Sequence, residues 1–269
     1  MLSPSVRWFL TASALGFTAA LVAAPARADD GAAAGTATSV AELRQTCRSG
    51  HDEPPPDPLA IIARHDKALA ACNALIDRHN LAGQALVTTL LDRADLLAPG
   101  TGTAYTQALA DYARVIALAP KMSVAFWKRG QARLLYMRDL PRALSDLDTA
   151  IGLDPSQAEF FVTRASIQAS LGEPTKALGD LDRAITLVPH LERAWSLRGL
   201  THFNNGDTNR AIADFDEAIR LAPDADDNYR FRAAAKRAAG REAEAVADEA
   251  KAEALSARSP GTPAPVTRP

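Results

Sequence analysis

The sequence has few aromatic residues, only two cysteines and almost no net charge. Aromatics make up 6% of the 269 residues, and 30 Lys and Arg face 32 Asp and Glu, for a net charge of −2. This balance excludes the basic surface that nucleic acid requires. Alanine, the best helix former, is abundant instead, so the composition favours an α-helical protein.

The motifs of common catalytic and metal sites are also missing. The five histidines (His51, His65, His79, His190 and His202) form no His-Glu-x-x-His, and no Cys-x-x-Cys is present. The chain has no Gly-rich phosphate loop and no Gly-x-Ser-x-Gly elbow. We therefore expect no enzyme, no metal, no cofactor and no small-molecule substrate. The aspartate pairs Asp146/Asp148, Asp180/Asp182 and Asp214/Asp216 are interpreted as a solvated helix surface.

The first residues have the pattern of a secretory signal. Arg7 precedes an uncharged, mostly apolar stretch from Trp8 to Ala24, and Ala26-Arg27-Ala28 fits a small-x-small cleavage site. We expect cleavage after Ala28 and a periplasmic or secreted protein. The alternative is a retained anchor, and membrane contact is expected only in that case.

Cys47 and Cys72 are predicted to form a structural disulfide in an oxidising compartment. The bond would close a loop of about 25 residues and contribute on the order of 3 kcal/mol. The alternative is two unrelated thiols, with Cys72 a small core residue.

A repeat is visible in the prolines that follow helical segments. Pro120, Pro155, Pro189 and Pro223 stand 35, 34 and 34 residues apart and close the segments ALADYARVIALAP, ALSDLDTAIGLDP, ALGDLDRAITLVP and AIADFDEAIRLAP. Twelve, eight and five residues before each proline, small or apolar residues form one helical face. Six residues after each proline stands an aromatic (Phe126, Phe161, Trp195 and Tyr229), and ten after it a small residue (Gly130, Ala165, Gly199 and Ala233).

Turn residues separate the two helices of each unit. Pro141 and Pro174 suit a first helical turn, while Gly172, Gly206 and Gly240 suit a helix end. The sequence Ser156-Gln157-Ala158-Glu159 predicts a capping box. Neither helix of a unit can bury its apolar stripe alone, so the units must stack.

The period and the spacing resemble the tetratricopeptide repeat, a 34-residue helix pair with a closing proline. The resemblance implies an all-α fold, an α-solenoid (superhelix) of antiparallel helix pairs. The expected organisation is a signal peptide over 1–28, a flexible leader and Pro-rich strap over 29–58, the solenoid over 59–257 and a disordered tail over 258–269. Within the solenoid we expect an orphan helix over 59–80, repeats at about 86–122, 123–156, 157–190 and 191–224, and a cap over 225–257.

The position directly before the small residue of each first helix departs from the usual repeat, which often has leucine there. This chain has arginine five times, and an aspartate recurs in phase in each second helix. We expect a structural ladder of intra-repeat ion pairs: Arg93 with Asp111, Arg129 with Asp146, Arg164 with Asp180, Arg198 with Asp214, and Arg232 with Asp248.

The resemblance further implies a groove lined by the first helices, which normally takes an extended or helical peptide. Residues four, seven, eleven and fourteen past each proline should face it. They are Val124, Trp127, Gln131 and Leu134; Glu159, Val162, Ser166 and Ala169; Arg193, Ser196, Leu200 and Phe203; and Asp227, Arg230, Ala234 and Arg237. An apolar anchor at Trp127 beside Arg193, Arg230 and Arg237 suits a segment with hydrophobic and acidic residues.

The expected function is a non-catalytic scaffold of the cell envelope that binds a protein or peptide. The alternative is a structural or assembly subunit of an envelope or secretion complex that self-associates through repeat edges. A further alternative for Trp127 and Leu134 is packing against the leader or the preceding helix pair.

Overall fold

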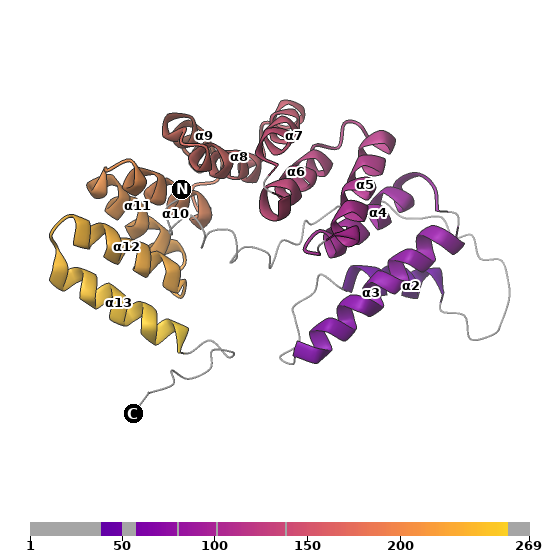
Figure 1. The fold of residues 1–269 in the computed structure, drawn as a ribbon, viewed down its shortest axis with the longest axis horizontal. Coiled ribbons are helices and arrows are strands. Elements are labelled where there is room, and N and C mark those ends of the chain that lie inside the picture. Colours follow the sequence, from indigo (N-terminus) through magenta and orange to yellow (C-terminus); the bar gives the residue numbers. More distant parts are fainter. Residues whose placement is uncertain (1–38, 50–57, 80, 101, 138, 258–269) are drawn as a thin grey trace. The chain divides into compact units, whose positions relative to one another are not determined.

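The structure is a computed structural model that describes residues 39–49, 58–79, 81–100, 102–137 and 139–257 (Figure 1). These residues form twelve α-helices and one π-helical segment, with no strand among them. The predicted all-α fold class is confirmed. The expected signal peptide (1–28) and tail (258–269) lie outside the described residues, as does nearly all of the Pro-rich strap. The chain divides into two compact units, Met1–Asp146 and Leu147–Pro269.

The first unit consists of helices that pack as antiparallel neighbours. Its elements are α2 (Val40–Arg48), α3 (Pro58–Arg78), α4 (Gly83–Leu97), α5 (Thr103–Leu118), α6 (Ser123–Ala132), η2 (Arg133–Met137) and the first half of α7 (Leu140–Leu153). α2 packs on α3, and α4 on α5. The core between α4 and α5 contains Ala94, Ala108 and Tyr112, which are at most 2% exposed.

The second unit holds three complete helix pairs. Its elements after α7 are α8 (Ala158–Ser170), α9 (Pro174–Leu187), α10 (Glu192–Asn204), α11 (Thr208–Leu221), α12 (Asp226–Ala238) and α13 (Glu242–Ser256). α8 pairs with α9, α10 with α11, and α12 with α13. Each of the ranges 157–190, 191–224 and 225–257 contains one pair (Figure 1).

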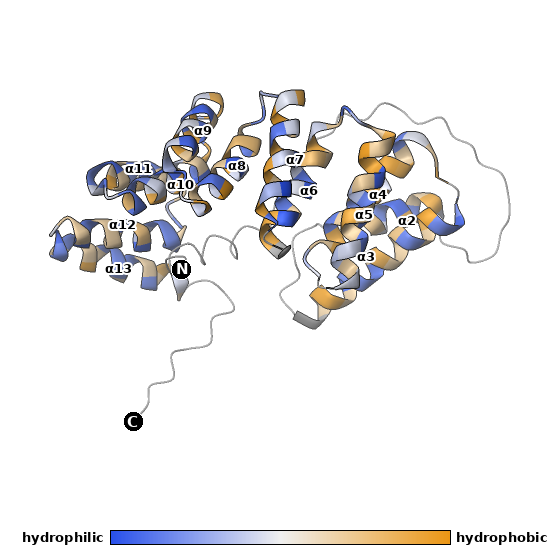
Figure 2. Cartoon of the chain, turned by 45° about the horizontal axis from the view of Figure 1, so that its top comes forward, coloured by the Kyte–Doolittle hydropathy of each residue, from blue (hydrophilic) through white to orange (hydrophobic). Residues whose placement is uncertain are grey.

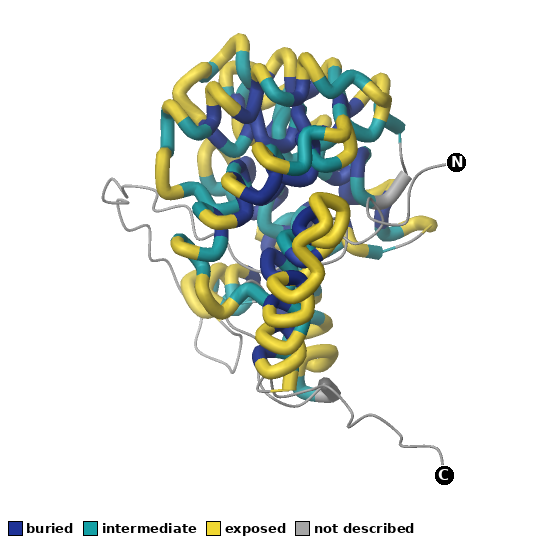
Figure 3. Tube along the Cα trace, turned by 90° about the vertical axis from the view of Figure 1, so that its left-hand side faces the viewer, coloured by how far each residue is buried: buried dark blue, intermediate teal, exposed yellow. Residues whose placement is uncertain are grey.

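The second helices bury the stripe that the sequence spacing predicted. Ala177, Leu181 and Ala184 of α9 are fully buried, as are Ala211, Phe215 and Ala218 of α11. Hydrophilic and hydrophobic residues accordingly alternate around the helices (Figure 2), and buried residues recur along one side of them while outer turns are exposed (Figure 3). Burial of this stripe between paired helices is the main source of cohesion within each unit.

Glycine ends the first helix of each repeat in the second unit. Gly172, Gly206 and Gly240 have φ of 77°, 86° and 75°. At Gly172 the next amide, that of Glu173, donates to the carbonyl of Gln168 at 2.9 Å, which reverses the chain toward α9. A left-handed residue is required here, and glycine adopts it without a Cβ clash.

The one 35-residue spacing has a structural cause in η2. In the repeats of the second unit, the paired arginine and aspartate are 16 residues apart, but Arg129 and Asp146 are 17 apart. The extra residue lies in the wider turn of η2, where the amide of Asp139 donates to the carbonyl of Arg133 at 3.2 Å. The π-helical turn therefore keeps the ion pair in register despite the insertion.

Two expectations for the N-terminal part and one for a helix cap were wrong. Val40–Arg48, assigned to the leader, is helix α2, and because it packs on α3, the helix over 59–80 is not an orphan. Ser39 and Glu42 form the reciprocal capping box that starts α2. The capping box predicted at Ser156 is absent, because the Ser156 hydroxyl donates to Asp154 instead.

Gly199 tests whether α10 and α11 pack so closely that no side chain fits between them. A Cβ at this position would lie 2.9 Å from the ring of Phe215, whereas one at Gly179, in the middle of α9, would meet nothing within 4 Å. We expect Gly199→Ala to lower the free energy of unfolding by about 1–3 kcal/mol through overpacking. Gly179→Ala should instead raise it by roughly 0.5–1 kcal/mol. Urea denaturation of both variants measures the difference, and equal effects would contradict the packing assigned to Gly199.

Candidate functional site

All five arginine–aspartate pairs of the expected ladder are hydrogen-bonded. In each pair Nε and Nη2 of the arginine donate to the two carboxylate oxygens over 2.6–3.1 Å. The five aspartates are only 2–8% exposed. Bidentate, largely desolvated pairs of this kind fix the orientation of two groups as well as attracting them. The ladder therefore joins the two helices of each repeat.

The third arginine nitrogen connects neighbouring repeats. Nη1 of Arg164, Arg198 and Arg232 donates at 2.7 Å to Asp148, Asp182 and Asp216 respectively, each in the second helix of the preceding repeat. Asp148, Asp182 and Asp216 are more than half exposed, as expected of a solvated helix surface, but each also binds the following repeat. The solvated interpretation was wrong for their partners Asp146, Asp180 and Asp214, which are buried. Two residues occupy the equivalent place without a carboxylate, Ala113 in α5 and Ala250 in α13.

Aromatic rings and further polar groups surround the ladder. The guanidinium groups of Arg129, Arg164, Arg198 and Arg232 lie 4.7–5.8 Å from the ring centres of Phe126, Phe161, Trp195 and Tyr229. Arg133 and Lys236 give Asp146 and Asp248 a second cation. Burial alone would raise the pKa of Asp248, but the hydrogen bonds from Arg232 and Lys236 lower it below its usual value. The carboxylates of the ladder are thus fully paired with cations, and their role is structural.

The expected groove residues differ widely in accessibility. Val124 is 36% exposed, and Trp127, Gln131 and Phe203 are partly buried. Leu134, Val162 and Leu200, by contrast, are only 5%, 2% and 5% exposed, and Ser196 is 4% exposed. These four assignments as ligand contacts were wrong, because the side chains belong to the interior of the helix layer. Burying the apolar ones is favourable, since it removes their surface from water.

The three arginines expected to make the groove basic are paired within the chain. Arg193 Nη1 donates to Glu159 Oε2 at 3.0 Å. Arg230 donates to Asp226 and to the Ser256 hydroxyl. Arg237 binds both carboxylate oxygens of Glu249, at 2.7 and 3.0 Å, and also contacts Glu242. The positive potential that favoured an acidic partner is therefore largely neutralised.

Carboxylates are instead prominent at the start of the first helices in the second unit. Glu159, Arg193 and Asp227 hold the same repeat position, four residues past the closing prolines, on α8, α10 and α12. Burial raises the pKa of Glu159, although Arg193 opposes the rise. Burial, aided by the charge of Asp226, likewise raises the pKa of Asp227. Sequence spacing placed both acids on this face, but only packing reveals that their ionised forms are disfavoured.

A polar network joins α10 to α12 beside these acids. The Ser196 hydroxyl donates to Asn228 Oδ1 at 2.6 Å, and Asn228 Nδ2 donates to Glu192 Oε1 at 2.6 Å. No signal in the sequence pointed to it, since Asn228 stands one position beyond the expected groove spacing. The network orients the first helices of adjacent repeats, and so shapes the face on which Glu159 and Asp227 lie.

The glutamate–arginine pair differs from the ladder pairs. It has a single hydrogen bond, and Glu159 Oε1 and Arg193 Nε are buried without a hydrogen-bond partner. Buried polar atoms in native proteins are normally satisfied, so such exceptions require an explanation. The unused donor at Arg193 Nε and the unused acceptor at Glu159 Oε1 suit a ligand that supplies both an acceptor and a donor.

Three further features concern the cysteines, the potential metal ligands and the apolar character of the helices. The sulfur atoms of Cys47 and Cys72 are bonded to each other. In the described part of the chain, no group of three or more His, Cys, Asp or Glu side chains is arranged to hold a metal ion. Among the described helices, none combines the length and apolar character needed to cross a bilayer.

Comparisons with known proteins identify the repeat. Residues 133–192 and 192–225 match models of the tetratricopeptide repeat, and no curated protein matches the chain. The fold is similar to that of MamA, at 24% identity and a TM-score of 0.52, over 57% of this chain and 89% of that one. It is similar to a thermophilic TPR protein, TTC0263 from Thermus thermophilus, at 22% identity and a TM-score of 0.54, over 72% and 98%. It is also similar to YrrB, a TPR protein with an unusual peptide-binding site, at 18% identity and a TM-score of 0.51, over 71% and 93%.

The chain thus carries tetratricopeptide repeats over residues 133–225, and its helix pairs have the fold of this repeat class. Proteins built from these repeats are generally non-catalytic scaffolds, and the fold suggests protein or peptide binding.

The ladder predicts that removing a partly buried arginine destabilises the fold much more than removing an exposed one. We expect Arg164→Met to lower the free energy of unfolding by about 2–4 kcal/mol, because it leaves Asp180 buried without its partner. Arg210→Met, which removes only an exposed pair with Asp207, should cost about 0–0.5 kcal/mol. Urea denaturation measures both, and adding Asp180→Leu to Arg164→Met should recover part of the loss. Similar effects of the two arginine substitutions would contradict the ladder.

The lowered pKa of Asp248 predicts in which direction the stability of the fold changes with pH. An acid whose folded-state pKa lies below its unfolded value stabilises the fold above that value, and this stability is lost as the pH falls through the folded-state pKa. Acidification from about pH 7 to about pH 3 should therefore reduce the thermal midpoint of the wild type more than that of Asp248→Asn. The exposed Asp224→Asn serves as the control and should follow the wild type. An equal acid response of wild type and Asp248→Asn would refute the assignment.

Proposed function

We propose that this chain is a non-catalytic scaffold that binds a protein or peptide segment on the face formed by the first helices of its repeats. In the second unit this face comprises α8, α10 and α12, with Glu159, Arg193 and Asp227 at equivalent positions. In the first unit the corresponding surface on α6 offers Val124, Trp127 and Gln131. The peptide-binding site named for YrrB, a protein of similar fold, is in keeping with this role.

The observation that carries the proposal is that burial disfavours the ionised forms of the two acids on this face. Because their pKa values are raised, the ionised forms of Glu159 and Asp227 are less stable in the folded chain than in water. Their contribution to stability therefore increases as the pH falls through the raised pKa, the opposite sign to Asp248. Groups whose environment disfavours their charge are concentrated at functional sites. A bound segment that donates hydrogen bonds would compensate them.

The chemistry of this face favours a partner with donors and an apolar anchor. Glu159 Oε1 and the carboxylate of Asp227 accept, Arg193 Nε donates, and Phe203 adds partly buried aromatic surface. An extended segment supplies both amide donors and carbonyl acceptors from its backbone. The acids favour lysine or arginine side chains on that segment over the acidic residues first expected.

An envelope location is part of the proposal. The apolar stretch before Ala28 supports export, and the bond between Cys47 and Cys72 supports an oxidising compartment. The alternative role is that of a structural or assembly subunit that self-associates through the edges of its repeats.

Affinity capture from an envelope extract tests the proposal. We expect Phe203→Ala, Trp127→Ala and the double variant Glu159→Gln/Asp227→Asn each to reduce recovery of the bound partner by about tenfold. The double variant should keep or raise the thermal midpoint, since it removes two disfavoured charges. Loss of binding without loss of stability would separate recognition from folding.

Matched controls are available on other surfaces. Leu171→Ala removes a 46% exposed hydrophobic residue at the C-cap of α8, which is none of the expected groove positions, and Asp224→Asn removes an exposed acid. Both should bind as the wild type does. Capture that survives all the first-helix substitutions would favour assembly through repeat edges instead.

A further inference from the structure

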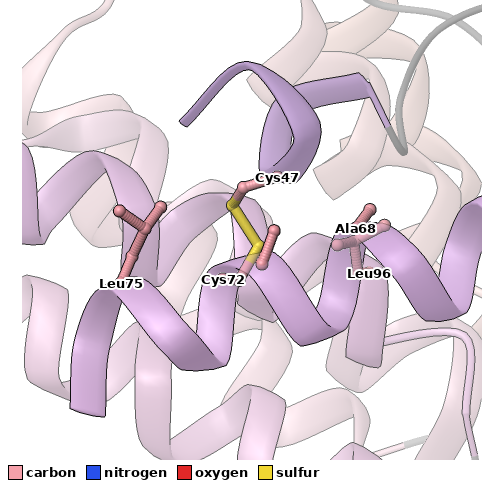
Figure 4. Packing of buried hydrophobic residues seen from close by; sticks show 6 residues of the cluster. Cys47, Ala68, Cys72, Leu75 and Leu96 are labelled. Carbon is pink, nitrogen blue, oxygen red and sulfur yellow. A yellow bond between two sulfur atoms is a disulfide. The ribbon is translucent and has the colours of Figure 1, made fainter. Parts of the chain in front are cut away.

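Helix α2 is attached to the first unit by packing on α3 and by one covalent bond. It packs on α3, and the Cys47–Cys72 disulfide crosses between them (Figure 4). Beneath it, Ala68, Ala71, Cys72 and Leu75 of α3, with Leu96 of α4, form a cluster in which no residue is more than 5% exposed. The bond thus holds a short helix over an apolar surface.

Few apolar side chains of α2 are buried against the rest of the unit. Cys47 is the only buried residue of this nine-residue helix, and Val40 and Leu43 are only partly buried against the cluster. Its ion pair, Arg48 Nε to Asp92 Oδ2, spans 3.8 Å, and the Arg48 side chain is 67% exposed. A helix of this length is marginal by itself, even with the good cap at Ser39. Without the disulfide, α2 would depend on its packing on α3, with the partly buried Val40 and Leu43, and on this exposed ion pair.

We propose that α2 is a redox-controlled latch on helices α3 and α4. With the disulfide formed, α2 covers the cluster on α3 and α4. With it reduced, α2 leaves this surface, and the apolar side chains of Ala68, Ala71 and Leu75 become accessible beside the thiol of Cys72. The latch is independent of the binding face proposed on α8, α10 and α12.

The chemistry requires a dithiol reductant. Its two thiols transfer two electrons and two protons, so that the Sγ–Sγ bond is replaced by two thiols while the reductant becomes a disulfide. Cys47 and Cys72 are 1% and 0% exposed, so the reductant reaches the sulfur atoms only when α2 opens transiently. Opening of α2 therefore limits the rate of reduction, and closing of α2 precedes reoxidation.

Hydrogen–deuterium exchange of the full chain, oxidised or reduced with dithiothreitol, tests this inference. After reduction, verified by thiol titration, protection of the α2 amides should fall on the order of a hundredfold, because the restraint on the chain is lost. The amides of α8 to α13 should be unchanged. The Cys47→Ser/Cys72→Ser variant should show the same loss in α2 without any reductant.

A second variant separates the bond from the packing. Leu43→Ser weakens the apolar contact but keeps the disulfide, so α2 should remain protected under oxidising conditions. Retention of α2 protection after complete reduction would overturn the latch, since packing alone would then hold the helix. Loss of protection throughout the first unit would overturn it as well, because the bond would then support the whole unit.

Discussion

Desolvated guanidinium groups are the constraint on which the repeats depend. An arginine between paired helices is stable only if its donors are satisfied, because an unpaired buried charge costs several kcal/mol. Each ladder arginine meets this requirement through a carboxylate of its own repeat, and three also bind a carboxylate of the repeat before. The distance and the angle between the two helices are thereby fixed more narrowly than by apolar packing alone.

The same constraint explains the irregularities of the array. One extra residue between Arg129 and Asp146 is accommodated by a π-helical turn, and the longer connection before α5 lies outside the paired segments. In both cases the insertion changes the chain around the ion pair and leaves the pair intact. Ala250 of α13, like Ala113 of α5, lacks the carboxylate that elsewhere binds the next ladder arginine, and Arg129 pairs with Asp146 without it.

Ion pairs on the first-helix face differ from those of the ladder. The ladder pairs are bidentate and their aspartates are buried. Glu159 and Arg193, in contrast, share one hydrogen bond and leave a donor and an acceptor unused. The ladder stabilises the fold, while Glu159 and Asp227 carry charges that burial disfavours. A stable frame that supports a less stable recognition surface is a common arrangement in binding proteins.

Much of this protein was determined by the sequence itself. The period of the prolines, the buried stripe at Ala177, Leu181 and Ala184, and the in-phase Arg and Asp predicted the helix pairs and the ladder, because these features follow from helical periodicity within one repeat. The period of one helix does not determine which side chains of the first helices are buried or paired, and only the tertiary structure decided it. It buried Leu134, Val162 and Leu200, paired Arg230 and Arg237 with nearby acids, and left Glu159 and Asp227 as the exceptional groups. It also placed α2 on α3, where a short, weakly hydrophobic segment becomes a helix because a disulfide and a neighbouring surface hold it.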